Sequence, residues 1–289
     1  FYNYLFTERA LRAIISVYGP LFCPAGRERD GRMEEIRSKD NPRVQLYMKL
    51  ASQKKARAQE GKFVLEGFKL LQEAVLSGIE VEAAYLTRES LESGREELAA
   101  LSGVRQAFLV SGAAAGRLSQ SRSPQGVYAV CKIPENRFAV NPAGKYIGLW
   151  GLQDPGNVGT IIRTADALGM DGVVLSEGSC DLYSLKVLRA AMGSAFRLPV
   201  LVTPMEAFLR ESGLTSFASV VDTSAPSILD TRFPPGCILL IGNEGNGLSD
   251  EQISKCTHRV TIPMKGRAES FNAAMAATIF IWEMARGTD

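Results

Sequence analysis

The feature that most constrains the fold is a run of short apolar segments that alternate with helical stretches over the second half of the chain. The segments are nearly continuous in Val, Ile, Leu and small residues, as in Cys237–Ile241. Strands of that composition are buried on both faces, which is typical of parallel sheets covered by helices. We expect strands at Tyr146–Trp150, Gly172–Leu175, Leu198–Val202, Ser216–Val221, Ile238–Ile241 and Arg259–Ile262. The second half is therefore predicted to be an α/β domain with a mostly parallel sheet.

The first half, from Met33 to about Lys132, alternates in the same way but over shorter distances. Strand candidates are residues 62–66, 81–86, 107–110 and 126–130, with helices beginning at Phe68 and Arg88. Residues 133–144 carry two prolines and a glycine between periodic segments, which favours a linker. We therefore expect a smaller α/β domain at 33–132, a linker at 133–144 and the larger domain at 145–289.

Residues 1–32 differ in composition from the rest of the chain. They begin apolar and aromatic and end in the charged run Arg27–Arg32. A signal peptide places its basic residues before the apolar stretch, whereas here they follow it. We expect Met33 to be the native start and residues 1–32 to be a non-native or upstream extension. The alternative is an ordinary additional N-terminal helix.

The net charge of +2 conceals an uneven distribution. Residues 144–289 hold 12 Lys and Arg against 15 Asp and Glu, which leaves 21 against 16 for residues 1–143. Nine basic and three acidic residues lie between Arg37 and Lys69. Such a basic segment beside a mildly acidic domain is typical of a polyanion-binding module, although a solvated helix face is the alternative. The candidate contacts are Arg43, Lys54, Lys55, Arg57, Lys62 and Lys69.

A single histidine, His258, limits the chemistry available to the chain. It excludes a His-rich metal site, and a Ser–His–Asp or Cys–His apparatus would have to use that residue. The five cysteines are odd in number and lack a C-x-x-C pair, which favours a reduced, cytoplasmic protein without disulfides or zinc. No stretch approaches the roughly 20 apolar residues needed to span a bilayer. We expect neither a metal site nor a membrane partner.

Three loops rich in glycine and polar residues follow predicted strands, where open α/β sheets bind their ligands. The first is Asp154–Gly159, in which Asn157 is placed to cap the next helix. Arg163 lies on that helix close to positions that should be buried, such as Ile161 and Ala165. We expect its guanidinium to reach back into the cleft; a surface arginine is the alternative.

The second loop, Gly242–Gly247, directly follows an apolar strand. Its spacing G-x-x-G-x-G differs from the dinucleotide fingerprint G-x-G-x-x-G, and the acidic partner about 20 residues onward is missing. No G-x-x-x-x-G-K-[ST] occurs, which excludes a P-loop NTPase. Glu244 between glycines is, by itself, typical of a turn residue that faces solvent. Ser249 and Gln252 predict a capping box for the helix that follows.

The third loop, Ile262–Asn272, leads into a long helix expected over Ser270–Arg286. That helix is apolar almost all round, so it is either buried or packed in an interface. Ser270 fits the position of an N-cap. Asn272, in the first turn of so apolar a helix, needs a polar partner.

The chain closely resembles the SpoU-type (TrmH-like) RNA ribose 2′-O-methyltransferases of the trefoil-knot (SPOUT) superfamily in three ordered motifs. They are D-P-G-N-V-G-T-I-I-R-T-A, I-L-L-I-G-N-E-G-N-G-L-S and V-T-I-P-M…E-S-F-N-A-A-M-A-A, within about residues 145–287. The first half is similar to the L30e-like substrate-binding domain that often precedes this catalytic domain. That similarity lies in S-K-D-N-P-R-V, F-V-L-E-G-F-K-L and S-P-Q-G-V-Y-A-V.

The resemblance implies a trefoil-knotted, mostly parallel sheet flanked by helices, preceded by a smaller L30e-like α/β domain that binds RNA. It also implies S-adenosylmethionine (AdoMet) as cofactor and an obligate homodimer formed through the knotted domain. Carried over by position, the cofactor site comprises Leu240, Gly242, Asn243, Glu244, Gly245, Ile262, Pro263, Met264, Phe271 and Asn272. The family usually has Leu in place of Phe271 and commonly Asn in place of Asp154.

The implied reaction is attack of a ribose 2′-hydroxyl on the sulfonium methyl group. The implied catalytic residues are Arg163, Asn157, Glu244, Ser270 and Asn272. The family's proposed base is the counterpart of Arg163, but a guanidinium pKa above about 12 disfavours that role. We expect Arg163 to bind the phosphate beside the target ribose and to stabilise the developing alkoxide. His258 precedes the third motif, and we expect it to begin a strand.

Three alternatives remain open from the sequence. The L30e-like domain favours large-subunit, 23S-type rRNA as the substrate, with tRNA as the runner-up. Base methylation, such as that of guanine N1, occurs elsewhere in the superfamily, but the spacing N-x-G-x-I-x-R from Asn157 to Arg163 favours ribose. A non-catalytic rRNA-binding assembly protein is the alternative from another class, and the presence of both Arg163 and Asn272 argues against it.

Overall fold

The structure is a computed structural model that describes residues 33–93, 103–136 and 138–286. The extension expected at residues 1–32 lies outside the described residues. The chain divides into two compact units. One is Phe1–Pro134 with Tyr183–Leu185, and the other is Glu135–Leu182 with Lys186–Asp289. We call them the N-terminal unit and the C-terminal unit and describe each by itself.

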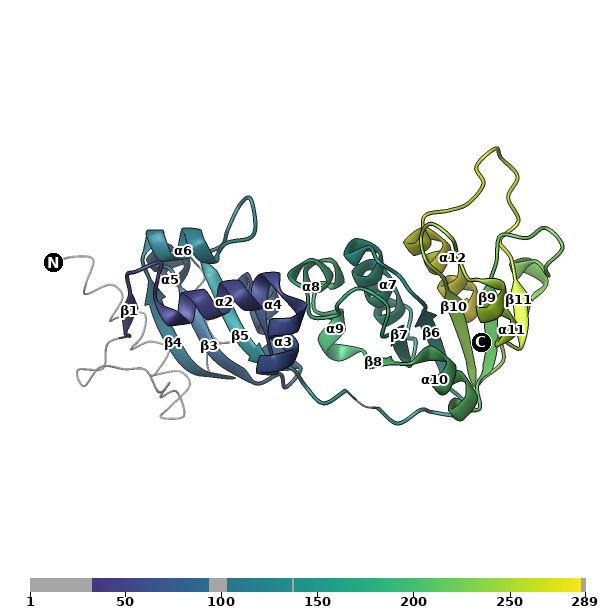
Figure 1. Ribbon diagram of the computed structural model, residues 1–289, viewed down its shortest axis with the longest axis horizontal. Coiled ribbons are helices and arrows are strands. Elements are labelled where there is room, and N and C mark those ends of the chain that lie inside the picture. The colour runs from purple at the N-terminus through teal and green to yellow at the C-terminus, as the bar shows by residue number, and fades with distance from the viewer. Residues whose placement is uncertain (1–32, 94–102, 137, 287–289) are drawn as a thin grey trace. The chain divides into compact units, whose positions relative to one another are not determined.

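The N-terminal unit is built on a five-stranded sheet (Figure 1). Its elements are β1 Glu35–Ile36, α2 Pro42–Ser52, α3 Lys54–Glu60, β2 Lys62–Glu66, α4 Phe68–Leu76, β3 Val81–Leu86, α5 Arg88–Ser93, β4 Val104–Val110, α6 Gly112–Leu118 and β5 Val127–Lys132. The order is β1-β4-β3-β5-β2, and β5 runs antiparallel to both of its neighbours. The carboxyl ends of β1 to β4 therefore lie at one edge of the sheet. The strands expected at 62–66 and 81–86 are confirmed to the residue.

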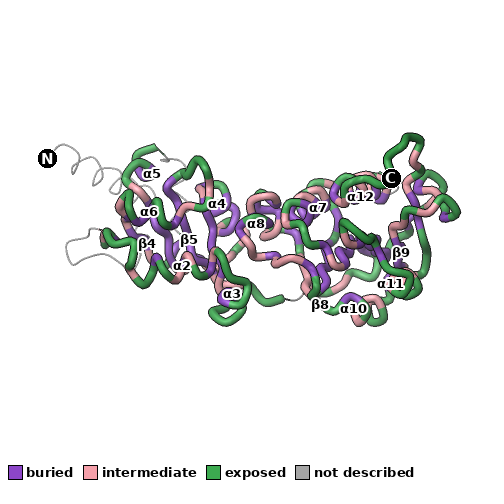
Figure 2. Tube along the Cα trace, turned by 45° about the horizontal axis from the view of Figure 1, so that its top comes forward, coloured by how far each residue is buried: buried purple, intermediate pink, exposed green. Residues whose placement is uncertain are grey.

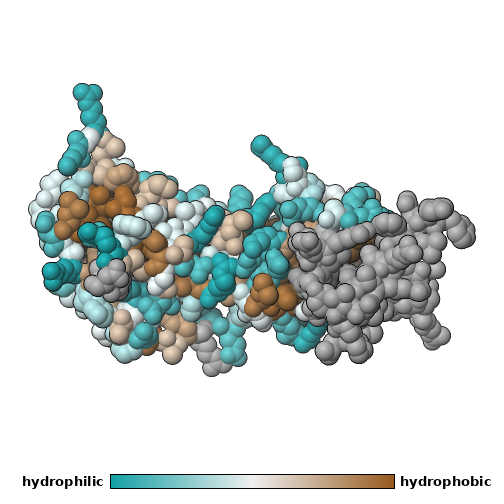
Figure 3. All heavy atoms as spheres, turned by 180° about the vertical axis from the view of Figure 1, so that it is seen from behind, coloured by the Kyte–Doolittle hydropathy of each residue, from teal (hydrophilic) through white to brown (hydrophobic). Residues whose placement is uncertain are grey.

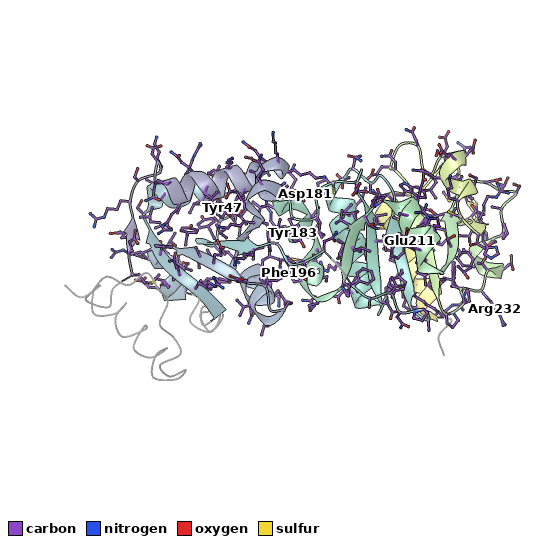
Figure 4. The ribbon with its side chains drawn as sticks, turned by 60° about the horizontal axis from the view of Figure 1, so that its bottom comes forward. Tyr47, Asp181, Tyr183, Phe196, Glu211 and Arg232 are labelled. Carbon is purple, nitrogen blue, oxygen red and sulfur yellow. The ribbon has the colours of Figure 1, made fainter. Side chains whose placement is uncertain are left out.

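Aromatic rings fill the core between α2 and this sheet. Tyr47, labelled in Figure 4, is fully buried. Its ring lies edge-to-face with those of Tyr85 and Tyr128, at ring-centroid distances of 6.4 and 5.9 Å. Its hydroxyl donates to the Leu65 carbonyl at 3.0 Å, so the polar end of the ring has its partner. Burial raises the pKa of Tyr85 to about 12, so this hydroxyl stays neutral in the core.

The C-terminal unit contains a six-stranded sheet in the order β11-β9-β10-β6-β7-β8, and every neighbouring pair is parallel. Its elements are β6 Lys145–Leu149, α7 Pro155–Ala167, β7 Gly172–Ser176, α8 Leu185–Ala191, α9 Ser194–Arg197, β8 Val200–Thr203, α10 Met205–Ser212, β9 Thr215–Ser219, the 3-10 turn Ile228–Asp230, β10 Cys237–Ile241, α11 Asp250–Ser254, β11 His258–Val260 and α12 Ala273–Arg286. The expected parallel sheet is confirmed. Strands β9 and β11 end two residues earlier than expected, and the residues beyond them form loops. The trefoil knot stays a prediction of the resemblance.

Strands β6, β7 and β10 are buried along their whole length, as their apolar composition predicts. Figure 2 shows buried segments in purple in the interior of this unit. Lys145 at the start of β6 is buried although it is charged. Its ammonium donates to the Met284 carbonyl at 2.5 Å. The last carbonyls of a helix have no partner within the helix, so this bond caps α12 from the sheet.

Helix α12 begins at Ala273, three residues later than expected. One face is buried through Ala274, Ala277, Ile281 and Met284. On the opposite face Met275 and Trp282 are 54% and 59% exposed. The helix is therefore buried on one side and free on the other within the C-terminal unit.

The C-terminal unit also exposes hydrophobic residues elsewhere, and Figure 3 shows them among hydrophilic ones on one of its faces. The large exposed ones in this unit are Met192, Val221, Leu229, Phe271, Met275 and Trp282. Among the described helices, none combines the length and the apolar character that crossing a membrane requires.

Candidate active site

A cleft of about 510 Å³ opens at the carboxyl ends of β9, β10 and β11. Its lining comes from residues 219–222 after β9, 241–248 after β10, and Thr261, Ile262 and Met264 after β11. Residues 269–271, which precede α12, and Ala273, Ala276 and Phe280 of α12 complete the lining. Because the three strands are parallel neighbours, their carboxyl ends meet at one edge, which is where such sheets bind ligands.

Residues 219–222 were not expected in the site. The sequence marks β9 as a strand but does not say that β9 lies between β10 and β11. Asp222 is the charged member of this segment, and its carboxylate contacts the Arg259 guanidinium at 2.9 Å. Hydrogen bonds from Ser224, followed by the nearby Arg259, hold the pKa of Asp222 below its ordinary value. The cleft therefore has an ionised acidic group at its rim.

The loop after β10 closes tightly on itself. The Asn243 amide donates to the Gly247 carbonyl at 3.0 Å, and the Gly247 amide returns a bond to the Asn243 carbonyl at 2.8 Å. A Cβ at Gly242 would lie 2.2 Å from the Gly247 carbonyl carbon, so only glycine fits there. The Asn243 side chain donates to the Gly151 carbonyl at 2.9 Å, which ties this loop to the loop after β6.

Glu244 points from this loop to the start of α7. One carboxylate oxygen accepts from the Gln153 amide at 3.0 Å, and the other accepts from the Asp154 amide at 2.9 Å and the Asn157 side chain at 3.2 Å. Burial opposes ionisation of this carboxyl, but these hydrogen bonds outweigh it, and the pKa of Glu244 lies below its ordinary value. Glu244 is thus an ionised acceptor rather than a turn residue that only faces solvent.

Asn157 does not cap α7, contrary to expectation. Asp154 is the N-cap, and its side chain accepts from the Asn157 backbone amide at 2.8 Å. The Asn157 side chain is buried; besides donating to Glu244, it accepts from the Asn272 side chain at 3.0 Å. One hydrogen-bonded chain, Glu244–Asn157–Asn272, therefore joins the three motifs. This chain supplies the polar partner that Asn272 was expected to need.

Asn272 also replaces Ser270 as the cap of α12. Its side-chain oxygen accepts from the amides of Ala274 and Met275 at 2.9 and 3.3 Å. Ser270 is exposed and lines the cleft, as does Phe271. The capping box expected at Ser249 and Gln252 is confirmed at the start of α11.

Five expected catalytic or cofactor residues do not line the cleft: the hydrogen-bonded Asn157 and Asn272, and also Leu240, Pro263 and Arg163. The Leu240 side chain is fully buried in the core, and Ile241 lines the cleft in its place. Pro263 lies between two lining residues without lining the cleft itself. Arg163 is exposed on α7 and does not reach into the cleft; within the described residues it has no hydrogen-bond or ion-pair partner. Its guanidinium is therefore free to bind a ligand from solvent.

The basic residues expected to contact a polyanion fall into different environments in the N-terminal unit. Lys54 and Lys55 are exposed on α3, and the Arg43 guanidinium lies 4.5 Å from the centre of the Phe108 ring. Lys62 and Lys69 form ion pairs with Glu82 and Glu73 at 2.7 and 2.6 Å.

Arg57 is the exception among these six residues. It is only 5% exposed, and its guanidinium donates to the Leu50 carbonyl and, at 3.4 Å, to the Ala51 carbonyl. These bonds satisfy the end of α2, because the last carbonyls of a helix lack partners. The expectation that Arg57 contacts a polyanion is therefore wrong.

Comparison with known proteins agrees with this arrangement. Residues 144–282 match the SpoU rRNA Methylase family, and residues 41–129 match the MRM3-like substrate binding domain. The 23S rRNA (guanosine(2553)-2′-O)-methyltransferase RlmP of Bacillus subtilis is 34% identical over 256 residues, covering 87% of this chain and 99% of that relative.

Solved structures show the same fold along nearly their whole length. The AdoMet-bound rRNA methyltransferase from Sinorhizobium meliloti has a TM-score of 0.76 at 29% identity, covering 89% of this chain and 98% of that one. The SpoU methyltransferase AviRb from Streptomyces viridochromogenes, in complex with AdoMet, has a TM-score of 0.77 at 28% identity, covering 85% and 97%. Together with the three motif loops around one cleft, these matches show that the chain belongs to the SpoU rRNA methylase family.

Proposed function

We propose that this protein transfers the methyl group of AdoMet to a ribose 2′-hydroxyl of large-subunit rRNA. The observation that carries the proposal is the Glu244–Asn157–Asn272 chain beside the cleft, because it brings one residue of each motif to one place. The substrate class is supported by RlmP and by the Sinorhizobium meliloti protein, both of which are named for rRNA methylation. We assign the reaction to the cytoplasm, because five scattered cysteines without a C-x-x-C pair are typical of a reduced protein.

The cleft fits AdoMet in its chemistry. Apolar residues Ile262, Met264 and Phe271 line the cleft together with the closed loop 242–247, and small-molecule sites combine these two kinds of surface. AdoMet supplies an electrophilic methyl group on its sulfonium. The residues assigned to hold it are Gly242, Asn243, Glu244, Gly245, Ile262, Pro263, Met264, Phe271 and Asn272, with Leu240 contributing backbone only.

The polar residues at the cleft position groups rather than exchange protons. Both Glu244 oxygens are occupied by hydrogen bonds, and the low pKa of this carboxyl makes it a poor base near neutral pH. His258 begins β11 as expected, lies 5.0 Å from the Phe217 ring, and is outside the cleft lining. We assign the ribose proton to water or to an RNA phosphate.

Arg163 is assigned to the RNA. Its five donors in a fixed fork match a phosphate, and its charge stabilises the alkoxide that develops on the ribose. The exposed, unpartnered guanidinium supports this role, because nothing within the described residues has to be displaced first. Ser270 is exposed at the cleft, and we assign it to hold the target ribose.

The test is methyl transfer from labelled AdoMet to protein-free rRNA and, separately, to tRNA. Arg163→Ala should lower the rate by about 10²- to 10³-fold, the loss typical of a missing charge-stabilising donor, while AdoMet affinity by calorimetry stays unchanged. Arg163→Lys should lose most of the rate too, because an ammonium cannot bind phosphate bidentately.

Arg210→Ala is the matched control, since Arg210 is exposed and pairs with its neighbour Glu211. The labelled linkage should resist alkali, as a 2′-O-methyl group blocks cleavage. Near-normal rates for Arg163→Lys would refute the bidentate role. Label on the base, or on tRNA alone, would overturn the assigned substrate.

The two halves of the chain are proposed to divide the work. Residues 33–132 bind RNA, residues 133–144 form the linker between the two parts, and residues 145–289 catalyse the methyl transfer. The exposed cations Arg43, Lys54 and Lys55 support RNA binding by the first part, and Lys62 and Lys69 can contribute after releasing their acidic partners. The match to a substrate binding domain at residues 41–129 supports the same division.

A homodimer is proposed to form through the C-terminal unit. The supporting feature is the free face of α12, where Met275 and Trp282 lie seven residues apart and thus on one side of the helix. Exposed apolar side chains at that spacing are typical of a helix that packs against another helix.

A further inference from the structure

Glu66 is a buried carboxylate at the carboxyl end of β2, with only 7% of the residue exposed. Burying a charge is costly unless hydrogen bonds compensate it. One oxygen accepts from the hydroxyls of Ser119 and Ser121 at 3.1 and 2.7 Å and from the Ser121 amide at 3.3 Å. The other accepts from the Gln120 amide at 3.1 Å. All of these donors belong to the loop between α6 and β5.

The same loop is fixed again at its other end. The Gln125 side-chain oxygen accepts from the Phe68 amide at the start of α4, at 3.1 Å. The next residue, Gly126, accepts from the Thr87 amide at 2.9 Å, directly after β3. Residues 119–126 are thus tied to the loops after two strands, at the edge where the carboxyl ends of β1 to β4 meet.

Between these two anchors the loop is exposed over residues 122–125. It carries Arg122, and Arg117 lies just before it at the end of α6; both are exposed. Within the described residues neither guanidinium has a hydrogen-bond or ion-pair partner. Free guanidiniums on a fixed backbone suit phosphate groups, which arginine binds through paired hydrogen bonds. Phosphate contacts are also the ones that set the orientation of a protein on nucleic acid.

We propose that Glu66 is a positioning residue for RNA: its buried carboxylate holds the loop 119–126 so that Arg117 and Arg122 bind phosphates of the RNA substrate. The proposal rests on the proposed function and adds two contacts to it. Hydrogen bonds to a charged carboxylate are stronger than those to a neutral acceptor, so the four bonds to Glu66 hold this loop more firmly than four neutral bonds would. A more flexible loop would have to be ordered when RNA binds, and affinity would fall.

The experiment measures binding of full-length protein to labelled, protein-free 23S rRNA over a range of salt concentrations. Arg117→Ala/Arg122→Ala should weaken binding about tenfold or more at low salt and reduce the slope of log K against log [salt] by about 1.4 to 1.8, the value for two phosphate contacts. Glu66→Gln should weaken binding about tenfold, because the NH2 group of glutamine would point at hydrogen-bond donors of the loop, where the carboxylate of Glu66 accepts. Its KM for RNA in methyl transfer should rise while kcat at saturating RNA is kept.

Arg105→Ala/Lys132→Ala is the matched control, since it removes the same charge at the opposite edge of the same sheet, where both residues pair with Glu80. Urea unfolding followed by far-UV circular dichroism reports folding of each variant. Ser121→Ala, which removes one of the four bonds, replaces Glu66→Gln if that variant does not fold. Wild-type affinity in the arginine and Glu66 variants overturns the proposal. An equal loss in the control overturns it too, because general electrostatics would then explain the effect. A wild-type protein that binds rRNA through this loop but transfers no methyl group would refute the proposed function instead.

Discussion

The carboxylate of Glu244 lies where the start of a helix offers free amides. It accepts from Gln153 and Asp154 and holds the Asn157 side chain, so one residue orders the first turn of α7 from a distant loop. The donors lie about 90 positions away in the chain, which is why the sequence identifies Glu244 only through resemblance. Arg57 also has a role that its residue type does not indicate. The sequence suggests an exposed cation, but the side chain is buried and donates to carbonyls of α2.

We predict that Glu244→Gln lowers the stability of the protein in a pH-dependent way. The folded pKa of Glu244 lies below its ordinary value of 4.5, so its contribution is full at neutral pH and is lost as pH falls through the folded pKa. The free energy of unfolding, measured with urea, should therefore favour the wild type at pH 7. That difference should shrink below pH 4.5, whereas a constant difference would contradict the role of the charge.

At the scale of elements, the sequence predicts well whatever has a local cause. Strands β2 and β3 and the capping box of α11 follow from periodicity and from residues within one turn. Where two nearby residues could each cap a helix, the sequence alone predicts the wrong one. Asp154 caps α7 in place of Asn157, and Asn272 caps α12 in place of Ser270. In both cases a tertiary hydrogen bond decides, because Asn157 and Asn272 bind each other.

The packing of α7 against α8 yields a second prediction. A Cβ at Gly159 would lie 2.5 Å from the Ala190 Cβ and 2.6 Å from the Val187 carbonyl oxygen, and backbone cannot move aside easily. Gly159→Ala should therefore lower the free energy of unfolding by about 1 to 3 kcal/mol, the usual cost of overpacking. Gly178→Ala, where nothing lies within 4 Å, is the control and should be near neutral. If both variants were equally stable, α7 and α8 would be able to move apart without a loss in the free energy of unfolding.

At the scale of the whole chain, the charge distribution was visible in the sequence, but the availability of each charge was not. Of the basic residues between Arg37 and Lys69, some are exposed and have no partner in the described part of the chain. Lys62 and Lys69 are paired, and Arg57 is buried. The position of the cleft depends on strand order, which places β9 between β10 and β11. Strand order arises from contacts between distant segments, so residues 219–222 could not be placed in the site beforehand.

The free face of α12 gives a prediction about assembly. Trp282→Glu should convert the proposed homodimer to a monomer, because a charge on that face cannot be buried without a partner. Light scattering after size-exclusion chromatography measures the mass directly. Leu76→Glu is the matched control: Leu76 is 75% exposed in the N-terminal unit, and its replacement should leave the mass unchanged. A wild-type monomer, or a dimer that survives Trp282→Glu, would contradict the proposed interface.

The Glu244–Asn157–Asn272 chain has a thermodynamic consequence for the two ligands of the proposed reaction. A cofactor that orders loop 242–247 also orders α7 through Glu244, and α7 carries Arg163, so less ordering remains to be done when RNA arrives. Linkage makes this effect reciprocal: the factor by which AdoMet tightens RNA binding equals the factor by which RNA tightens AdoMet binding. The protein would then retain AdoMet most firmly while the ribose to be methylated is in place.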